Sequence, residues 1–536
     1  MQGASVDPSG RLRVVDQTPS TGYQNRANEG FTFEPDGRLN VGSAFSVTVA
    51  NAGLQVSNQG RMKFSPAPVS AAFYNKGWPL NVDGSTLMYI NQPVPHDTPF
   101  NAGIAMDDRG VYATTTPAPP APTTRFDLTQ FPLDPRINNT RNSVGTYWGE
   151  YGTLLTAAIN EPRPYRNPTG GPILGLMIEE TATNTVRNSV AAGAVVGTPG
   201  VQPTNWIIPN PGAGLTRSIV GTGVEKGIEY VDIRYSGVSN AVFINIYGDQ
   251  TNNTPAINGE TFSSSFFWKL VAGSFDNITC RQSVFDAALA YLAEAGNSAT
   301  LSPSNEISRI SCTGTIANAA TAYLNGYVQI RFPNGVPVDF TIRIGLPQTE
   351  KKAFVTSPIK TTNAPVTRQF DKAIIDPTSW WNPVEGTLAC KATIGYSPRI
   401  AGISNLMWSA DQVGGAFGAG CYGTFQSNTG IGLAPGAAPV NMTSTVNDGV
   451  STYAILAVGL KGNDSIAAVN GVLGAADLAC AMPIGVNQLA IGQVGWGTLA
   501  GNSCINGYIA YIDYWNTRLP NNQFQELSQW GYQGAS

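Results

Sequence analysis

Charged side chains and histidine are scarce in this 536-residue sequence. Asp, Glu, Lys and Arg together make up 12% of the chain, about half of the usual share. The formal net charge of −4 is spread along the chain without a basic cluster, so we expect no nucleic-acid partner. The single histidine, His96, lies in the proline-rich segment QPVPHDTP, which is typical of a loop or an interface and argues against a Ser–His–Asp hydrolase.

Paired cysteine motifs are also absent. None of the six cysteines lies in a Cys-x-x-Cys pair, and with one histidine we expect no zinc site. The pattern favours buried free thiols made in a reducing cytoplasm. A disulfide between Cys280 and Cys312, or between two of the last four cysteines, is the alternative if the protein meets oxidising surroundings.

Long apolar runs are missing as well. No stretch of about 18 apolar residues predicts a membrane span, and the first residues, MQGASVDPSGRLRVV, lack the apolar segment of a signal peptide. We therefore expect a soluble protein without membrane insertion or Sec-type export. The glycine-rich segment GGAFGAGCYG (414–423) lacks the Lys-Ser/Thr of a phosphate-binding loop, and we expect no cofactor.

Glycine and proline, in contrast, are abundant, with 59 and 37 residues, while apolar residues still make up 42% of the chain. Short strand-like runs bounded by Gly, Asn and Pro recur throughout, so we expect an ordered, all-β fold. We divide it into a repeat region (1–113), a Pro/Thr-rich extended linker (114–135), a first β-sandwich (136–363) and a second β-sandwich (364–536). The segment DAALAYLAEAGNS is interpreted as a long strand or one short helix.

The repeat region places a polar turn with glycine before a strand-like run five times, at spacings of 23–27 residues. The glycines are Gly10, Gly37, Gly60, Gly84 and Gly110. A regular period of this size indicates stacked supersecondary units, which we interpret as β-hairpins. Since a chain of hairpins buries little apolar surface alone, we expect sister subunits or a docking surface to complete it. An ordinary small β domain with chance similarity is the alternative.

The C-terminal run NGYIAYIDYWNTRL predicts a strand with two largely apolar faces, as in a central strand that is covered on both sides. Its tyrosines and Trp515 are therefore interpreted as core residues. A short helix is expected to begin at Pro520 or Asn521, with Phe524 and Leu527 on one face against the edge of the sandwich.

Three stretches carry a resemblance to a known group of proteins. The first is residues 138–184, where NTR is followed by NEPR and then by GLMIEETATN; the second comprises PTNW, GIEYVDIRYSG and DFTIRIGLPQTEKKAFVTSPIKT; the third comprises FDKAIIDPTSWWNPVEGTL and NGYIAYIDYWNTRLPNNQFQEL. In this order they resemble bacteriophage virion structural proteins of the tail fibre, spike or head-decoration type. The resemblance implies a jelly-roll, carbohydrate-binding-module-like domain over 136–363 and a concanavalin A- or laminin G-like domain over 364–536.

The same resemblance implies a location and partners. The protein would be assembled in the host cytoplasm as a homo-oligomer, typically a trimer, and would dock on other virion proteins through its N-terminal repeats. On the surface of the virion it would meet a host-surface glycan. Three roles follow: a tail fibre or spike that attaches to glycans, a capsid decoration or head fibre protein, and a glycan depolymerase. We expect no enzyme, because Glu179 and Glu180 are adjacent on an expected strand and point to opposite faces, unlike the carboxylate pair of a glycosidase.

Sugars are bound by aromatic faces together with Asn, Asp and Gln side chains at sandwich edges or loop tips. The candidate carbohydrate-binding residues, all in the last domain, are Trp381, Trp408, Asp411, Tyr422, Trp496 and Asn502. For the loop aromatics, a place in the core is the alternative. No metal is assigned. A calcium site at Asn447 and Asp448, or at Asp411, is less favoured than a simple hairpin turn in VNDGV.

Overall fold

The structure of the protein is a computed structural model. It describes residues 119–394, 405–411, 453–493 and 504–530, apart from 211 and 484, and beyond these the backbone of strands within 2–115 and 419–446. The chain forms two compact units, residues 1–120 with 534–536, and residues 121–533. Strands dominate both, which confirms the expected all-β class. Among the described residues, no helix has the length and apolar character needed to cross a membrane.

The first unit consists of short antiparallel strands. They are β1 (Gln2–Val6), β2 (Leu12–Asp16), β3 (Phe31–Phe33), β4 (Leu39–Val41), β5 (Leu54–Val56), β6 (Met62–Phe64), β7 (Thr86–Met88), β8 (Ala102–Asp107) and β9 (Gly110–Thr115). The hairpins β1–β2, β3–β4 and β5–β6 flank Gly10, Gly37 and Gly60. The β-hairpin interpretation of these repeats is thereby confirmed.

The second unit contains a large sandwich, called here the host sandwich, built from residues 121–178 and 371–530. One sheet has the order β14-β15-β38-β29-β34-β35-β36, with β10 also paired to β38, and the other has the order β11-β28-β37-β30-β31-β32-β33. The bounds are β10 (Thr124–Asp127), β11 (Ile137–Thr140), β14 (Pro164–Tyr165), β15 (Gly175–Ile178), β28 (Lys372–Ile375), β29 (Glu385–Ile394), β30 (Asn405–Asp411), β31 (Ala419–Phe425), β32 (Thr429–Pro435), β33 (Val440–Val446), β34 (Tyr453–Lys461), β35 (Ile466–Val469), β36 (Val472–Leu473), β37 (Gln488–Ile491) and β38 (Gly507–Trp515). A separate hairpin joins β12 (Gly145–Trp148) to β13 (Leu154–Ala157).

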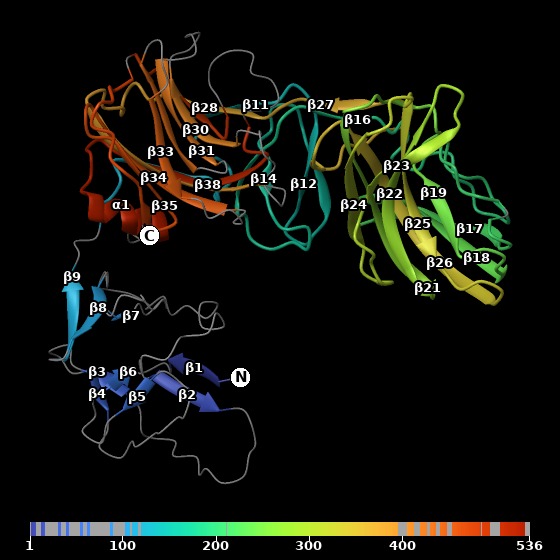
Figure 1. Ribbon diagram of the computed structural model, residues 1–536, viewed down its shortest axis with the longest axis horizontal. Coiled ribbons are helices and arrows are strands. Elements are labelled where there is room, and N and C mark those ends of the chain that lie inside the picture. Colours follow the sequence, from blue (N-terminus) through green and yellow to red (C-terminus); the bar gives the residue numbers. More distant parts are fainter. Residues whose placement is uncertain are drawn as a thin grey trace. The chain divides into compact units, whose positions relative to one another are not determined.

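A second sandwich, called here the inserted domain (residues 186–361), lies within the chain of the host sandwich (Figure 1). Its sheets have the orders β17-β18-β26-β21-β24 and β19-β25-β22-β23, with β20 paired to β25. The bounds are β17 (Thr216–Glu225), β18 (Ile228–Val238), β19 (Phe243–Tyr247), β20 (Thr254–Pro255), β21 (Thr261–Gly273), β22 (Asn277–Phe285), β23 (Tyr291–Asn297), β24 (Ser308–Thr315), β25 (Tyr323–Arg331) and β26 (Pro337–Glu350). The segment DAALAYLAEAGNS thus contains strand β23 and no helix.

The chain enters and leaves the inserted domain through a pair of short strands. These are β16 (Ala182–Asn184) and β27 (Val366–Arg368), which pair antiparallel. We call this pair the neck. The entering and leaving segments therefore run side by side, and both ends connect directly to strands of the host sandwich.

This arrangement differs from the expected boundaries. Residues 124–127 were expected in a linker but form β10, which pairs with β38. Residues 137–178 were expected in the first sandwich, yet β11 pairs with β28, and β15 pairs with β38. The alternation of apolar residues shows that a segment is a strand, but it does not encode which distant strand is its partner.

The end of the chain is arranged as the sequence predicts. Strand β38 is an interior strand, and Tyr514 and Trp515 expose 0% and 2% of their surface. Helix α1 (Asn521–Trp530) follows and packs across β34, β35 and the edge strand β36. Phe524 and Leu527 are fully buried there. Gly459 makes the contact possible, because a Cβ atom at this position would lie 2.4 Å from the Phe524 ring.

Candidate functional site

Two of the expected carbohydrate-binding residues lie in the core of the host sandwich. Trp408 and Asp411 belong to the interior strand β30 and expose 0% and 1% of their surface. The Asp411 carboxylate accepts hydrogen bonds from Ser409 Oγ, at 2.8 Å, and from Gln488 Nε2. The expectation that this pair lies at a loop tip is therefore wrong, because β30 is covered and offers no face to a ligand.

Trp381 lies between β28 and β29 and is half-buried. Its ring stacks on Tyr514 with centroids 5.3 Å apart and planes at 21°, and Trp380 lies edge-on at 6.4 Å. One face of Trp381 is thus occupied by the core. Of the other expected residues, Tyr422 lies in β31, where only the backbone is described, and Trp496, Asn502, Asn447 and Asp448 lie outside the described residues.

A different group of residues forms a continuous polar and aromatic surface on sheet β19-β25-β22-β23. One side of this sheet packs into the core through residues such as Ile246, Val328 and Cys280. Since side chains alternate along a strand, the intervening residues of β19, β22 and β25 face away from the core. Bulges between β22 and β23 bring Tyr291, Glu294 and Asn297 to the same side. We call this surface the outer face. Strand pairing orders it into the rows Phe243–Arg331–Asn277, Asn245–Gln329–Thr279, Tyr247–Tyr327–Arg281–Asn297, Asn325–Ser283–Glu294 and Tyr323–Phe285–Tyr291.

The residues around Tyr327 contact one another closely. The rings of Tyr247 and Tyr327 have centroids 4.8 Å apart, with planes at 33°. Tyr327 Oη donates a hydrogen bond to Glu294 Oε1 at 2.9 Å. Arg281 Nη1 donates to both oxygens of the same carboxylate, at 2.7 and 2.8 Å. These contacts fix two aromatic rings, a guanidinium and a carboxylate in one place before any ligand arrives.

Exposure is lowest at the centre of the outer face and highest at its margins. Tyr327 and Gln329 on the central strand β25 expose only 3% and 5% of their surface. Phe243 exposes 40% and Tyr291 59%, and 35% of the Glu294 side chain is exposed. The central residues therefore form a floor, and the flanking strands carry the groups that a ligand would meet first.

The surroundings raise the pKa values of two tyrosines and one arginine of the outer face. Burial raises the pKa of Tyr327, so its hydroxyl remains a hydrogen-bond donor. Burial also raises the pKa of Tyr247, against a hydrogen bond to Asn245 that lowers it. For Arg281, burial would lower the pKa, but the hydrogen bonds with Glu294 outweigh it and raise the pKa. Arg281 thus keeps its positive charge beside Glu294.

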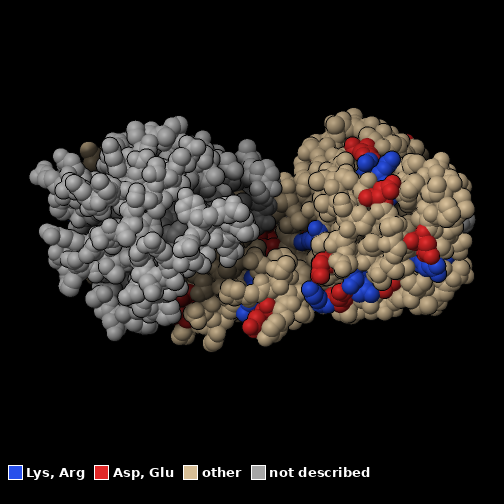
Figure 2. Space-filling view, turned by 90° about the horizontal axis from the view of Figure 1, so that it is seen from below, with Lys and Arg blue, Asp and Glu red and all other residues tan. Residues whose placement is uncertain are grey.

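A cavity of ≈ 390 Å³ adjoins the outer face at Glu294. It is lined by small residues of β22 to β24 and by the segment that follows β24, including Val284, Thr315 and Asn318. The described residues contain no group of three or more His, Cys, Asp or Glu side chains placed to hold a metal ion. In Figure 2, the charged side chains of the described part lie mostly as neighbouring pairs of opposite sign within uncharged surface.

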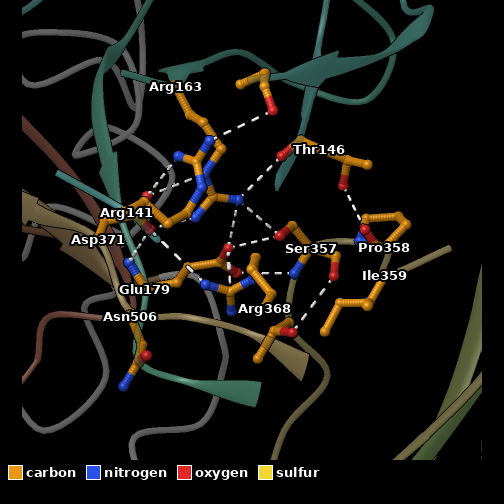
Figure 3. Close-up of polar contacts among 12 residues, drawn as sticks. Arg141, Thr146, Arg163, Glu179, Ser357, Pro358, Ile359, Arg368, Asp371 and Asn506 are labelled. Atoms are coloured by element: carbon orange, nitrogen blue, oxygen red, sulfur yellow. Dashed lines mark hydrogen bonds and ion pairs between the residues drawn. The ribbon is translucent and has the colours of Figure 1, made fainter. Parts of the chain in front are cut away.

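A second cluster of charged groups lies beside the neck and is buried (Figure 3). Asp371, just before β28, is 3.0 Å from Arg141 Nη1 and also pairs with the Arg163 guanidinium. Glu179, just after β15, is 2.8 Å from Arg163 Nη1 and 3.5 Å from Arg368 Nη2. Glu179 therefore contacts two arginines, and Asp371 contacts three, since Arg368 Nη1 lies 3.8 Å from it. Residues that are distant in sequence thus meet where the chain enters and leaves the inserted domain.

The inserted domain reaches this cluster through the segment that follows β26. Ser357 donates to Glu179 through its backbone N–H, at 2.8 Å, and through its hydroxyl, at 2.6 Å. Burial alone would raise the pKa of Glu179, but Arg368, Arg163 and the Ser357 hydrogen bonds outweigh it and lower the pKa to about 2. The cluster is closed to solvent, so we assign it the structural role of joining the two sandwiches.

The outer face was missed at the level of the sequence, although its signal is present there. In NAVFINIYGD, the residues Phe243, Asn245 and Tyr247 alternate with Ile244 and Ile246. GYVQIRFPNG has the same alternation, with Tyr, Gln and Arg on the polar side. Each pattern predicts a strand with one face turned away from the core. Only the pairing in register brings the polar sides of four strands into one surface.

Comparisons with known proteins give matches of low similarity. No family model and no curated protein matches this chain. Among solved structures, it is similar to a tripod protein from the baseplate of bacteriophage Tuc2009, with 13% identity over 54% of this chain and 96% of that chain and a TM-score of 0.20. It is also similar to a tandem CBM22 domain of Paenibacillus barcinonensis Xyn10C, with 9% identity over 61% of this chain and 100% of that chain and a TM-score of 0.20. A sialidase of Trypanosoma rangeli has 11% identity over 59% of this chain and 62% of that chain, with a TM-score of 0.22. At these TM-scores, the matched structures carry no functional argument.

Proposed function

We propose that this chain binds carbohydrate, without catalysis, through the outer face of the inserted domain. The observation that carries the proposal is the group formed by Tyr247, Tyr327, Arg281 and Glu294. Tyrosine rings offer apolar faces to the C–H groups of a sugar, while an arginine and a carboxylate offer donors and acceptors to neighbouring hydroxyls. Because their mutual contacts hold these groups in place, a ligand need not order them on binding.

The number of carboxylates on the outer face supports binding rather than hydrolysis. Among the described strand residues whose side chains form the outer face, Glu294 is the one carboxylate, and Arg281 pairs with both of its oxygens. Most glycoside hydrolases need two carboxylates that flank the bond to be cleaved. The outer face therefore lacks the usual pair and retains the groups that recognise hydroxyls.

We further propose that binding attaches a bacteriophage virion to a host-surface glycan, with this chain as a tail fibre or spike. The proposal is supported by the sequence resemblance of residues 138–184 and 370–388 and by the N-terminal β-hairpins. A homotrimer docked on other virion proteins would present several weak sites together, which raises the overall affinity. A capsid decoration or head fibre protein would use the same face, and the copy number per particle distinguishes the two.

A glycan array probed with the full chain tests carbohydrate binding. We expect Tyr247→Ala to weaken binding roughly tenfold, a loss of about 1.4 kcal/mol, because it removes an aromatic face. Tyr151→Ala is the matched control, since Tyr151 is 80% exposed and lies between β12 and β13. Melting temperatures confirm that both variants are folded. Absence of binding at high protein concentration, or equal binding by Tyr247→Ala, would overturn the proposal.

A glycan depolymerase is the alternative, and one contact bears on it. The Tyr327 hydroxyl meets the Glu294 carboxylate at 2.9 Å, and sialidases use a tyrosine nucleophile. Activation of such a nucleophile requires a lowered pKa or an effective base, whereas burial raises the pKa of Tyr327. The test is whether the protein releases new reducing ends from host polysaccharide. If it does, and if Tyr327→Phe does not, the protein is a depolymerase and the non-catalytic proposal is wrong.

A further inference from the structure

Arg331, at one end of the outer face, differs from the other arginines of the described residues. Those arginines contact a carboxylate or donate to a backbone carbonyl, as Arg281 does with Glu294 and Arg217 does with Ile208. The one hydrogen bond of the Arg331 side chain goes to Gln329 Oε1 at a long 3.4 Å. Its guanidinium carries a full positive charge at every physiological pH. Within the described residues, this charge has no acidic partner.

The neighbours of Arg331 suit the ring and hydroxyls of a sugar. Strand pairing places Phe243 on one side of Arg331 and Asn277 on the other, in the same row. The Phe243 ring is 40% exposed, and the Arg331 guanidinium lies 5.9 Å from its centroid. Asn277 Oδ1 is shielded from solvent and has no hydrogen-bond partner. The row therefore combines an apolar face, an unneutralised cation and an amide.

The spacing of this row suits one ligand that also reaches the tyrosines. Phe243 and Tyr247 lie four residues apart on β19 and face the same way. At a rise of about 3.3 Å per residue, their Cα atoms are roughly 13 Å apart. The row Asn245–Gln329–Thr279 lies between them, and Gln329 Nε2 donates to Asn245 Oδ1 at 3.2 Å. The outer face is thus a continuous strip with an aromatic group near each end.

We propose that the row Phe243–Arg331–Asn277 is a subsite for a sugar carboxylate, so that the glycan bound by the outer face is acidic. This inference rests on the proposed carbohydrate binding. A planar guanidinium donates two parallel hydrogen bonds to a planar carboxylate, a geometry that a neutral hydroxyl cannot match. Phe243 packs against the sugar ring that carries the acid. Arg281 cannot take this role, because Glu294 already neutralises it.

The test compares acidic glycans with matched neutral counterparts on the same array, using the full chain. Each uronic or sialic acid glycan stands beside its carboxyl-reduced form, and sulfated glycans form a third set. We expect at least tenfold tighter binding of the carboxylated members, and we expect Arg331→Gln to remove that preference while neutral binding persists. Arg331→Lys keeps the charge but lacks the planar donor pair, so it should retain part of the preference. Arg234→Gln is the control, because Arg234 is 48% exposed and paired with Asp339.

The outcomes separate this inference from the function on which it rests. Equal binding of acidic and carboxyl-reduced glycans, with Arg331→Gln unchanged, would overturn the acidic subsite and leave carbohydrate binding intact. Binding confined to sulfated glycans would also overturn the carboxylate assignment. Binding of no glycan at all would overturn the proposed function itself. A preference that weakens with added salt and disappears in Arg331→Gln but not in Arg234→Gln would support the subsite.

Discussion

Strands β38 and β25 are both interior strands of their sheets, and both carry tyrosines, but they use them differently. In β38 of the host sandwich, the adjacent residues Tyr514 and Trp515 point to opposite faces and are both buried, so both faces enter packed surroundings. In β25 of the inserted domain, Tyr327, Gln329 and Arg331 share one face, while Val328 and Ile330 share the other. An aromatic residue thus indicates a binding surface only when its neighbours on the same face are polar. For this reason we look for the binding site on the inserted domain and not on the host sandwich.

The outer face and the cluster beside the neck differ in how far their charged groups are buried. The outer face keeps Arg281 and Glu294 partly exposed, where water screens them. The cluster beside the neck buries three arginines and two carboxylates, which are stable only while every partner is present. Changes at the neck should therefore affect stability, and changes at the outer face should affect binding.

The largest effect is expected from Asp371→Asn. The substitution removes the negative charge that faces Arg141 and Arg163, so two buried guanidinium groups lose their main partner. We expect the free energy of unfolding to fall by about 3–5 kcal/mol, measured by urea denaturation. Asp339→Asn is the control, because its pair with Arg234 is exposed, and it should cost less than about 1 kcal/mol. Equal losses in the two variants would show that burial of the neck charges contributes nothing.

A smaller loss in the free energy of unfolding is expected when the pH is lowered. The pKa of Glu179 in the folded protein is about 2, below the ordinary value of 4.5, so the folded state binds this proton less tightly than the unfolded state. The stabilisation is complete above pH 4.5 and is lost as the pH falls toward 2. Unfolding curves between pH 6 and pH 3 should show this loss in the native chain, on the order of 2–3 kcal/mol. In Glu179→Gln the chain should be less stable at pH 6, and its further loss toward pH 3 should be smaller. A parallel decline in both proteins would contradict the assignment.

The last effect concerns Asp513 on β38, and its pH dependence has the opposite sign to that of Glu179. Its carboxylate is fully buried, and although Arg125 of β10 lies 2.9 Å away, that side chain is 38% exposed and its charge is screened by water. Burial therefore outweighs the ion pair and raises the pKa of Asp513 to about 7. A raised pKa gives stability that is present at low pH and lost as the pH rises through 7. The melting temperature of Asp513→Asn minus that of the native chain should increase from pH 5 to pH 8. A difference in melting temperature that does not change with pH would refute this prediction.

Several parts of the fold and site were predictable because they depend on local patterns. The hairpins around Gly10, Gly37 and Gly60 follow from turn residues between short strands. The helix at Asn521 and the burial of Phe524 follow from helical spacing beside a sandwich strand. The position of Trp408 was not predictable in this way. It is buried and not at a loop tip, and a tryptophan near glycine-rich sequence has the same local pattern whether its strand is covered or exposed.

By itself, the sequence determined the class of the fold, the positions of many strands and, where a strand has no bulge, which of its residues share a face, because these depend on the two-residue period of a strand. Bulges between β22 and β23 put Tyr291 and Glu294 on one face although they are three residues apart. The tertiary structure alone decided which strands pair, since register is set by packing between segments that lie far apart in the chain. It brought residues 124–178 into the host sandwich and gathered Arg141, Arg163, Arg368, Glu179 and Asp371 at the neck. It also aligned four strands so that Tyr247, Arg281 and Glu294 meet, and left Arg331 without an acidic partner among the described residues.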